Sequence, residues 1–310
     1  MRKKYLISGS NGLLGQKLVY KLMGRNDIIC MATARGENRL VNKTGYEYHS
    51  LDISDKQNVL DVFKTCMPDV VIHTAAMTNV DACELNREEC WKLNVTAVGN
   101  LIEALEELKQ NNPSYQPHFI HLSTDFIFDG SHGPLTEEET PNPISYYGES
   151  KLAAEKLVQQ SKLSWAMART VLVYGIVDNM SRSNIVLWAK ENLSSGKTIH
   201  VVDDQYRTPT LAEDLADGCI LIADKKARGV YNISGKDYLN ILELVHKVAD
   251  YYGLDKSLIK PSKSTDIKQP AKRPPITGFI IDKAKRELGY NPHSFEEGIA
   301  IMDRQVKEMV

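Results

Sequence analysis

Short apolar runs alternate with amphipathic segments over the first 175 residues of the 310-residue chain. The apolar runs are continuous and bounded by turn residues, as is typical of buried strands. They predict strands at residues 4–8, 28–33, 69–73, 118–123 and 165–173. Apolar residues at helical spacing predict helices between them, at residues 12–23, around 58–64, over 86–110 and at 145–160.

This order of elements predicts an α/β fold with a doubly wound parallel sheet of the Rossmann type, covered by helices on both faces. Ligands of such a sheet bind beyond the carboxyl ends of its strands. The alternation of apolar runs and amphipathic segments breaks down after residue 175. We therefore expect one domain at residues 1–175 and a smaller C-terminal lobe formed mainly by residues 176–310. Segments near residues 200–235 are expected to return to the first domain, with a helix at 211–223 and a strand at 229–233.

Composition excludes several classes of function. The chain has 38 Lys and Arg residues against 40 Asp and Glu residues, so its charge does not attract it to nucleic acid or to an anionic membrane. No apolar run approaches the roughly 18 residues of a membrane span, and the one in MRKKYLI is too short for an export signal. The five cysteines are odd in number and form no C-x-x-C, which suits a reducing compartment. We therefore expect a cytoplasmic protein with neither a membrane nor a nucleic-acid partner.

A glycine-rich segment, Gly9-Ser10-Asn11-Gly12-Leu13-Leu14-Gly15, lies between the first predicted strand and the first predicted helix. Glycines permit a tight turn and let backbone N–H groups approach a pyrophosphate, while the helix N-terminus adds partial positive charge. Tight glycine turns without a ligand are common, but the position at the start of a βαβ unit favours dinucleotide binding. Residues 1–175 are therefore interpreted as an NAD(P)-binding domain.

The end of the second predicted strand bears on the choice of cofactor. NAD enzymes of this fold usually present an acidic residue there, whereas this chain has Arg35 and its next acid is Glu37. A guanidinium suits a 2′-phosphate, so Arg35 favours NADPH, with NADH possible and a solvated surface arginine as the alternative. Asp52, which precedes Ile53, either accepts a hydrogen bond from the adenine amino group or caps the following helix.

A tyrosine and a lysine lie four residues apart in Tyr147-Gly148-Glu149-Ser150-Lys151. On a helix Tyr147 and Lys151 share one face, whereas Tyr146 matches that face less well. A free phenol keeps its proton to about pH 10, and an ammonium beside a positively charged nicotinamide ring would lower that pKa into the catalytic range. Thr124 ends a predicted strand and could hold a substrate carbonyl oxygen while Tyr147 protonates it. The glycine-rich segment and Thr124 favour this interpretation over a chance Tyr-x-x-x-Lys.

With these motifs the chain resembles the extended short-chain dehydrogenases/reductases, and most closely the dTDP-4-dehydrorhamnose reductase family. The resemblance implies that Thr124, Tyr147 and Lys151 are catalytic and that Ala75, Ala76 and Asn94 also line the cofactor cleft. The shared stretches span nearly the whole chain: GSNGLLGQKL, LDI, PDVVIHTAAMTNVDACE, LNV, STDFIFDG, YYGESKLAAE, ARTVLVYG, DQYRTPTLAEDLA and KRPP.

Three positions separate this chain from its relatives. Related 4,6-dehydratases place an Asp-Glu pair after the threonine, whereas here Asp125 precedes Phe126, which favours carbonyl reduction over dehydration. Asp125 is interpreted more readily as a structural acid satisfied by local backbone than as a catalytic one. Leu172 replaces a tryptophan that usually faces the sugar in the family. Lys17 replaces a glutamate that helps some members to bridge a dimer through a metal, so we expect no metal.

The remaining candidate residues give weaker indications of function. His118 and His121 lie an odd number of residues apart on a predicted strand, so they point to opposite faces and are interpreted as structural or surface residues. The late Arg-Pro pair of the family lies near the substrate lobe, which favours a substrate contact for Arg273. The expected substrate contacts are Met77, Thr124, Asp125, Leu172 and Arg273.

The resemblance implies an NADPH-dependent oxidoreductase that reduces the 4-keto group of a nucleotide-activated deoxysugar. The expected reaction converts dTDP-4-dehydro-L-rhamnose to dTDP-L-rhamnose, a step of dTDP-rhamnose biosynthesis. Two alternatives stay open: an NADP-binding regulatory subunit like that of methionine adenosyltransferase, and a reductase or epimerase of another nucleotide sugar. A homodimer without a metal bridge is also possible.

Overall fold

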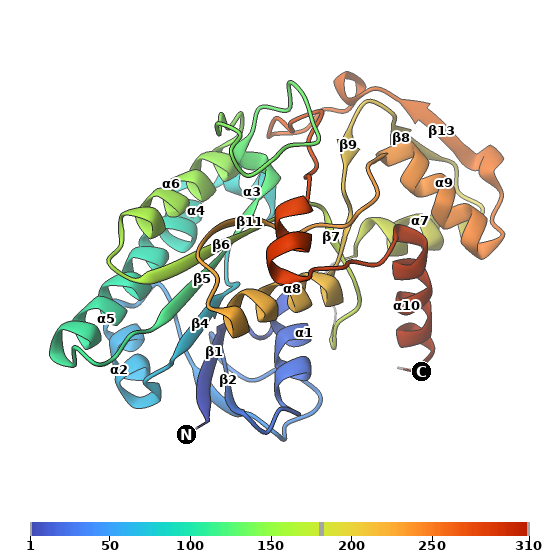
Figure 1. The fold of residues 1–310 in the computed structure, drawn as a ribbon. Coiled ribbons are helices and arrows are strands. Elements are labelled where there is room, and N and C mark those ends of the chain that lie inside the picture. The colour runs from blue at the N-terminus through green and yellow to red at the C-terminus, as the bar shows by residue number, and fades with distance from the viewer. Residues whose placement is uncertain (1, 180–182, 309–310) are drawn as a thin grey trace.

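Seven parallel strands form the central sheet of the computed structural model, which describes residues 2–179 and 183–308 (Figure 1). They lie in the order β11-β6-β5-β4-β1-β2-β3, and every neighbouring pair is parallel. This confirms the predicted α/β fold with a doubly wound sheet. The strands are β1 (Lys3–Ser8), β2 (Ile28–Ala34), β3 (Glu47–Ser50), β4 (Val70–His73), β5 (His118–Thr124), β6 (Ser164–Thr170) and β11 (Gly229–Asn232).

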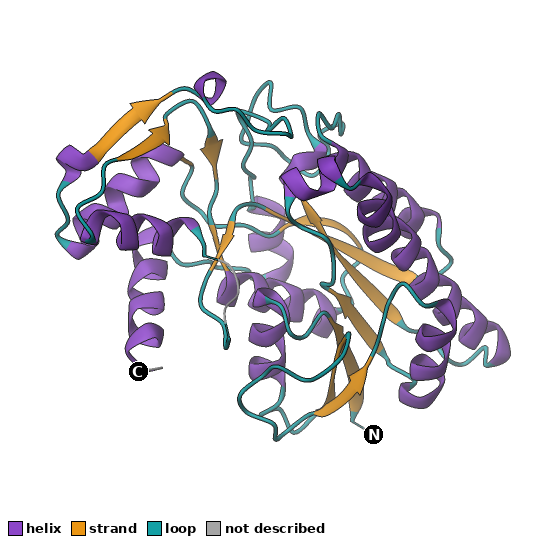
Figure 2. Cartoon of the chain, turned by 180° about the vertical axis from the view of Figure 1, so that it is seen from behind, coloured by secondary structure: helices purple, strands orange, loops and turns teal. Residues whose placement is uncertain are grey.

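Helices cover both faces of the sheet (Figures 1 and 2). Successive side chains of a strand point to opposite faces. Tyr5 and Ile7 of β1 accordingly pack with α1 (Leu13–Leu22) and α8 (Ala212–Lys225), and Leu6 packs on the other side. That second face is covered by α2 (Lys56–Cys66), α5 (Ala97–Asn111) and α6 (Tyr146–Gln160). Within the described ranges, none of the helices is both long and apolar enough to cross a membrane.

The C-terminal lobe has a separate core beside the carboxyl edge of the sheet (Figure 1). Its buried apolar residues include Val186, Leu244 and Phe295, one from each of its three helices. Its helices are α7 (Ile185–Ser194), α9 (Ile241–Tyr252) and α10 (Phe295–Glu308). Its strand pairs are β7 (Val173–Tyr174) with β10 (Thr210–Leu211), β8 (Ile199–Val202) with β13 (Ile259–Ser262), and β9 (Tyr206–Arg207) with β12 (Leu239–Asn240).

Two elements differ from the pattern-based prediction. The strand expected at residues 165–173 ends at Thr170, because Leu172 has a φ of 39° and turns the chain toward β10. The helix or helices expected over residues 86–110 are α4 (Arg87–Trp91) and α5, and between them lies a π-helical turn at Lys92–Thr96 that was not predicted. Such π turns insert an extra residue into the helical ladder and are frequent at functional sites.

One strand of the central sheet has no signal in the sequence pattern. The edge strand β3 has no buried residue, so its four positions lack the apolar run that marks the other strands. A short helix, α3 (Val80–Leu85), precedes α4 and was likewise not predicted. Both elements lie near the carboxyl edge of the sheet, where the loops after β2 and β4 begin.

Candidate active site

Loops from three strands meet at the point where the strand order reverses. The sheet runs from β1 through β2 to β3 on one side and from β4 through β5 to β6 on the other. Ser8, His73 and His121 occupy matching positions on β1, β4 and β5, so the loops that follow leave the sheet at one edge. Open α/β sheets bind ligands at such a reversal.

The glycine-rich segment 9–15 forms the turn from β1 into α1. Gly9 has a φ of 75°, and a Cβ there would lie 2.8 Å from the backbone nitrogen of Ala75. A Cβ on Gly15 would overlap the Gly9 carbonyl oxygen. Among the described residues, no side chain caps α1 at Gly12, so the N–H groups of its first turn can bind phosphate oxygens. The segment fits the pyrophosphate of a dinucleotide.

Asn11 ties this segment to the loop that follows β2. Its Nδ2 donates to the Glu37 carbonyl oxygen at 2.9 Å, and its Oδ1 accepts from the Arg39 backbone N–H at 2.9 Å. The side chain therefore fixes the two loops that would enclose the phosphates and the adenosine ribose. The other expected residues of the segment are buried or half-buried: Ser10, Leu13 and Leu14.

Arg35 and Asp52 follow β2 and β3, and the Arg35 side chain is exposed. Asp52 Oδ1 accepts hydrogen bonds from the N–H and hydroxyl of Ser54, at 2.9 and 2.8 Å. Burial opposes ionisation of Asp52, but these bonds and the charge of Arg35 hold the pKa of its carboxyl below the usual value. The residue that caps α2 is Asp55, so the alternative in which Asp52 caps that helix is wrong. Ile53 is buried.

Asn94 braces the loop after β4 from the π-helical turn. Its Oδ1 accepts from the Met77 N–H at 2.8 Å, and its Nδ2 donates to the Met77 carbonyl oxygen and to Ser150 Oγ, both at 3.0 Å. Because the side chain is buried and fully engaged, it organises the cleft wall more than it faces the cleft. Ala75 and Ala76 lie half-buried in the braced loop.

Tyr147 and Thr124 come together where α6 begins. Both side chains are buried, and the Thr124 hydroxyl lies near enough to the phenol to act on its pKa. Ser145 Oγ caps α6 by accepting from the Gly148 N–H at 3.2 Å. A Cβ on Gly148 would overlap the Phe126 carbonyl oxygen, so glycine lets the helix rest directly on the turn after β5. This close approach holds the phenol against the threonine hydroxyl.

Lys151 lies one helical turn after Tyr147 and is also buried. Its Nζ donates to the Leu122 carbonyl oxygen at 2.6 Å and contacts His121 Nε2 at 3.4 Å. Burial lowers the pKa of Lys151 to about 8, against the opposing charge of Glu155. Burial raises the pKa of Tyr147, although the neighbouring Thr124 hydroxyl opposes that rise. The expected lowering of the Tyr147 pKa requires the nicotinamide ring as well as Lys151, so it stays a prediction for the cofactor complex.

Tyr146 points away from this group. Its ring lies 4.8 Å from the Arg87 guanidinium and 6.3 Å from the Trp91 ring. Its backbone N–H donates to the Glu84 carboxylate. Of the two adjacent tyrosines, Tyr147 is therefore the one that contacts Thr124.

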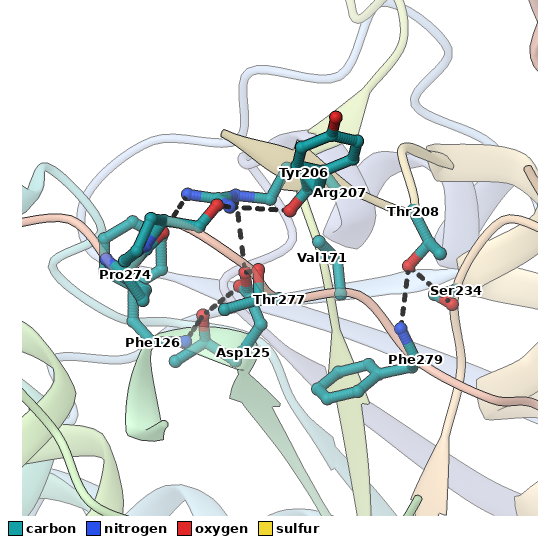
Figure 3. A network of polar contacts seen from close by, with 12 residues as sticks. Asp125, Phe126, Val171, Tyr206, Arg207, Thr208, Ser234, Pro274, Thr277 and Phe279 are labelled. Carbon is teal, nitrogen blue, oxygen red and sulfur yellow. Dashed lines mark hydrogen bonds and ion pairs between the residues drawn. The ribbon is translucent and has the colours of Figure 1, made fainter. Parts of the chain in front are cut away.

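The Asp125 carboxylate is held by residues of the C-terminal lobe (Figure 3). It accepts from the hydroxyls of Thr124 and Thr277, at 3.1 and 2.6 Å, and lies 3.7 Å from Arg207 Nε. Burial raises the pKa of Asp125, and Arg207 and the two hydroxyls oppose that rise. The sequence analysis expected Asp125 to be a structural acid that pairs with local backbone groups. Its partners are instead side chains, and two of them are distant in sequence.

Arg207 and Thr277 had not been expected at the site. Arg207 donates to the carbonyl oxygens of Tyr206, Pro274 and Pro275, at 2.7, 2.7 and 3.0 Å (Figure 3). These bonds clamp the 274–277 strap onto β9 and orient the guanidinium toward Asp125. Arg207 stands in the polar stretch DQYRTPT, so no apolar pattern marked its charge as buried.

The remaining expected substrate residues are more dispersed. Arg273 is paired with Asp81 of α3 at 2.7 Å and also bonds Gln269, so its guanidinium joins the strap to α3. Leu172 is half-buried at the turn after β6 and packs between the lobe core and the core beneath the strap. Met77 is half-buried in the loop that Asn94 braces.

Lys17 lies within α1 and forms an ion pair with Glu213 at 2.8 Å. It also donates to Gln305 at 3.2 Å, which links α1 to α10. Within residues 2–179 and 183–308, no three His, Cys, Asp or Glu side chains are grouped as metal ligands. Lys17 is thus engaged in helix packing.

Comparisons with known proteins agree with this geometry. A "probable low-salt glycan biosynthesis reductase" of Haloferax volcanii is 28% identical over 299 residues, covering 96% of each chain. The beta subunit of methionine adenosyltransferase 2 from Bos taurus is 29% identical over 264 residues, covering 84% of this chain and 75% of that protein. The solved structure of a dTDP-4-dehydrorhamnose reductase from Clostridium acetobutylicum superposes with a TM-score of 0.83 at 27% identity, covering 98% of this chain and 99% of that one.

A family model described as "RmlD substrate binding domain" matches residues 3–307, which is nearly the whole chain. The match includes the glycine-rich segment, the turn after β5 and the start of α6, the three regions from which the site is built. The chain belongs to the RmlD substrate binding domain family, within the extended short-chain dehydrogenases/reductases that its motifs resemble.

Proposed function

We propose that the protein reduces the 4-keto group of a nucleotide-activated deoxysugar with NADPH, converting dTDP-4-dehydro-L-rhamnose to dTDP-L-rhamnose. The observation that carries the proposal is the placement of the buried Thr124 hydroxyl beside the buried Tyr147 phenol, with Lys151 one turn further along α6. These groups lie at the sheet edge that the glycine-rich segment also faces, so a ketone and a dinucleotide can meet there.

The nicotinamide cofactor, when bound, supplies a hydride to the ketone carbon. Segment 9–15 and the start of α1 would hold its pyrophosphate, and the Lys151 ammonium would hold its nicotinamide ribose. On substrate binding the Thr124 hydroxyl would turn its proton from Asp125 to the ketone oxygen and orient that oxygen. Tyr147 transfers its phenolic proton to that oxygen, which completes the alcohol. Because burial raises the pKa of Tyr147, the phenol carries the proton to be donated at neutral pH.

The preference for NADPH rests on Arg35. Its exposed guanidinium follows β2, next to the loop that Asn11 fastens to the glycine-rich segment. A 2′-phosphate needs such a cation, whereas a free 2′-hydroxyl pairs better with a carboxylate. NADH remains a possible, weaker cofactor.

The residues after Thr124 favour reduction of the ketone over dehydration of the sugar. Phe126 occupies the position at which dehydratases carry a glutamate, so the site lacks that base. Residues 176–310 are proposed as mainly the substrate lobe, with Met77 and Leu172 nearest the sugar. We also propose a cytoplasmic enzyme, and a homodimer, if one forms, without a metal bridge.

A second candidate is a regulatory subunit, which the similarity to the bovine methionine adenosyltransferase subunit favours. The catalytic residue set of a reductase is present here, which a binding subunit would not need. A third candidate is an epimerase or reductase of another sugar. An epimerase keeps its cofactor through turnover, so NAD that co-purifies with the protein would favour it.

The test is NADPH oxidation by the purified protein with enzymatically prepared dTDP-4-dehydro-L-rhamnose. Tyr147→Phe should lower kcat by about 100- to 10,000-fold, because it removes the proton donor. Tyr146→Phe is the matched control and should keep kcat close to that of the unsubstituted protein. NADPH that binds without being oxidised would exclude the rhamnose reaction, and equal losses in the two variants would exclude Tyr147 as the donor.

A further inference from the structure

His121 lies beneath the lysine of the active site. It is on β5, three residues before Thr124, and its side chain is completely buried. Its Nε2 lies 3.4 Å from Lys151 Nζ, which approaches from α6. Of the two histidines on β5, only this one contacts α6, since His118 Nδ1 pairs with Ser164 Oγ at 2.9 Å. The sequence had marked both as structural or surface residues.

The contact fixes how the imidazole must be protonated. An ammonium group has three N–H donors and no acceptor, so His121 Nε2 has to present its lone pair to Lys151. The imidazole proton then resides on Nδ1, which has no hydrogen-bond partner among the described residues. A second N–H of Lys151 is held by the Leu122 carbonyl oxygen at 2.6 Å. Two of the three donors are therefore engaged by β5, which leaves one for the cleft.

We infer that His121 is a positioning residue for the proposed reaction: its neutral imidazole holds the Lys151 ammonium from the floor of the cleft and keeps it charged. The inference rests on the proposed function in one respect, namely that Lys151 binds the cofactor ribose. The contact itself is a property of the folded chain.

Neighbouring groups keep the imidazole uncharged. The His121 ring stacks on the His73 and Phe119 rings, with centroid distances of 5.5 and 6.5 Å. His73 Nδ1 is in turn 2.6 Å from Ser8 Oγ, which fixes that ring on β4. Burial, then the charge of Lys151, lowers the pKa of both histidines, that of His73 to about 3 and that of His121 well below its usual value. No second cation therefore competes with Lys151 at physiological pH.

The other ionisable groups that face Lys151 cannot replace this acceptor. Glu155 of α6 attracts the ammonium, but its carboxylate is already engaged by Arg169 through bonds of 3.0 and 2.7 Å. Cys90 of α4 and Cys83 of α3 act on Lys151 only through their charge. With burial disfavouring the ammonium, the acceptors on β5 are the contacts that stabilise it directly.

The experiment measures the ionisation of Lys151 directly. The full-length protein is labelled with [13Cε]lysine, and the Lys151 signal is assigned by its absence in Lys151→Arg. The pKa of Lys151 is followed by NMR in the unsubstituted protein, His121→Leu, His121→Gln and the matched control His118→Leu. NADPH affinity is measured in parallel by fluorescence at about pH 6, below the titration of Lys151, and at about pH 8, near its midpoint.

Removing the imidazole should lower the pKa of Lys151 by about one unit, which weakens NADPH binding about fivefold at pH 8 and leaves it unchanged at pH 6. His121→Gln, whose amide oxygen replaces the acceptor, should restore most of both values, and His118→Leu should change neither. A merely structural histidine would alter folding without this dependence on pH.

Equal Lys151 pKa values in His121→Leu and His118→Leu would overturn the inference. If His121→Leu gives no cooperative thermal transition, His121→Met takes its place in the same comparison. If the unsubstituted protein binds no NADPH at any pH, the proposed function fails, while the lysine titration still decides the role of His121.

Discussion

The Thr277 hydroxyl donates a 2.6 Å hydrogen bond to the Asp125 carboxylate, across 152 residues of sequence. Asp125 also accepts from Thr124, so the strap of the C-terminal lobe reaches the proposed catalytic threonine through a single carboxylate. Arg207 compensates the charge of that carboxylate inside the protein. The lobe and the catalytic turn are therefore linked by a buried polar contact as well as by apolar packing.

Thr277→Val should lower the rate of reduction. Without this hydroxyl the pKa of Asp125, which burial already raises, should rise further. A protonated Asp125 would accept more weakly from the Thr124 hydroxyl and would hold it less firmly in place. We expect kcat to fall about tenfold, and the acidic limb of its pH profile to move to higher pH.

Thr208→Val is the matched control for this change. Thr208 is also buried in the lobe junction, but it bonds Ser234 and the Phe279 N–H in place of Asp125 (Figure 3). Each variant should lose about 1 to 3 kcal/mol of unfolding free energy, measured by urea titration, because each removes a buried hydroxyl. A fall in kcat shared by both variants would assign the effect to general loosening of the junction.

Arg35→Ala should reduce the preference for NADPH. A guanidinium–phosphate contact contributes about 1.5 to 3 kcal/mol, so kcat/KM for NADPH should fall about 10- to 100-fold while that for NADH stays unchanged. Steady-state kinetics with both cofactors measure the ratio. Arg39→Ala provides the comparison, because Arg39 contacts Asn11 through its backbone. A larger NADPH loss in Arg39→Ala would assign the 2′-phosphate to Arg39.

Cofactor binding should weaken on the alkaline side of neutrality. The pKa of Lys151 is lowered to about 8 by burial, so the ammonium prevails below that pH and is lost above it. We expect kcat/KM for NADPH to fall tenfold per pH unit above about pH 8. Lys156→Met, which removes an exposed ammonium from the same helix, should keep this profile. A profile that stays flat to pH 10 would contradict the assignment of Lys151.

Acid should destabilise the protein through His73. Burial lowers the pKa of His73 to about 3, whereas in the unfolded chain the imidazole takes up a proton near pH 6.5. The unfolded state therefore binds more protons as pH falls from 6.5 toward 3, and stability is lost in that window. His73→Asn, which keeps a polar partner for Ser8, should remove about 2 kcal/mol of the loss between pH 6.5 and 5. If the free energy of unfolding in urea changes equally with pH in His73→Asn and in the unsubstituted protein, this prediction is wrong.

Much of the fold and the centre of the site followed from local patterns in the sequence. Continuous apolar runs identified the buried strands, and the glycine-rich segment identified the turn into α1, because both depend on residues within one or two turns of the chain. Tyr147 and Lys151 could be paired in advance, since an α-helix brings residues four apart onto one face. The edge strand β3 escaped detection because its residues bury too little apolar surface to leave a pattern.

Only the tertiary structure decided which charges are buried together. Asp125, Arg207 and Thr277 come from a strand end, a lobe strand and a late strap, and no periodicity in the sequence connects them. In the same way, the pairing of Arg273 with Asp81 and the contact of His121 with Lys151 depend on how separate elements pack. The physical reason is that the apolar pattern of one helix or strand shows only which of its faces is buried. The partner of a buried polar group depends on which other elements pack against that face, and this is set by the whole fold.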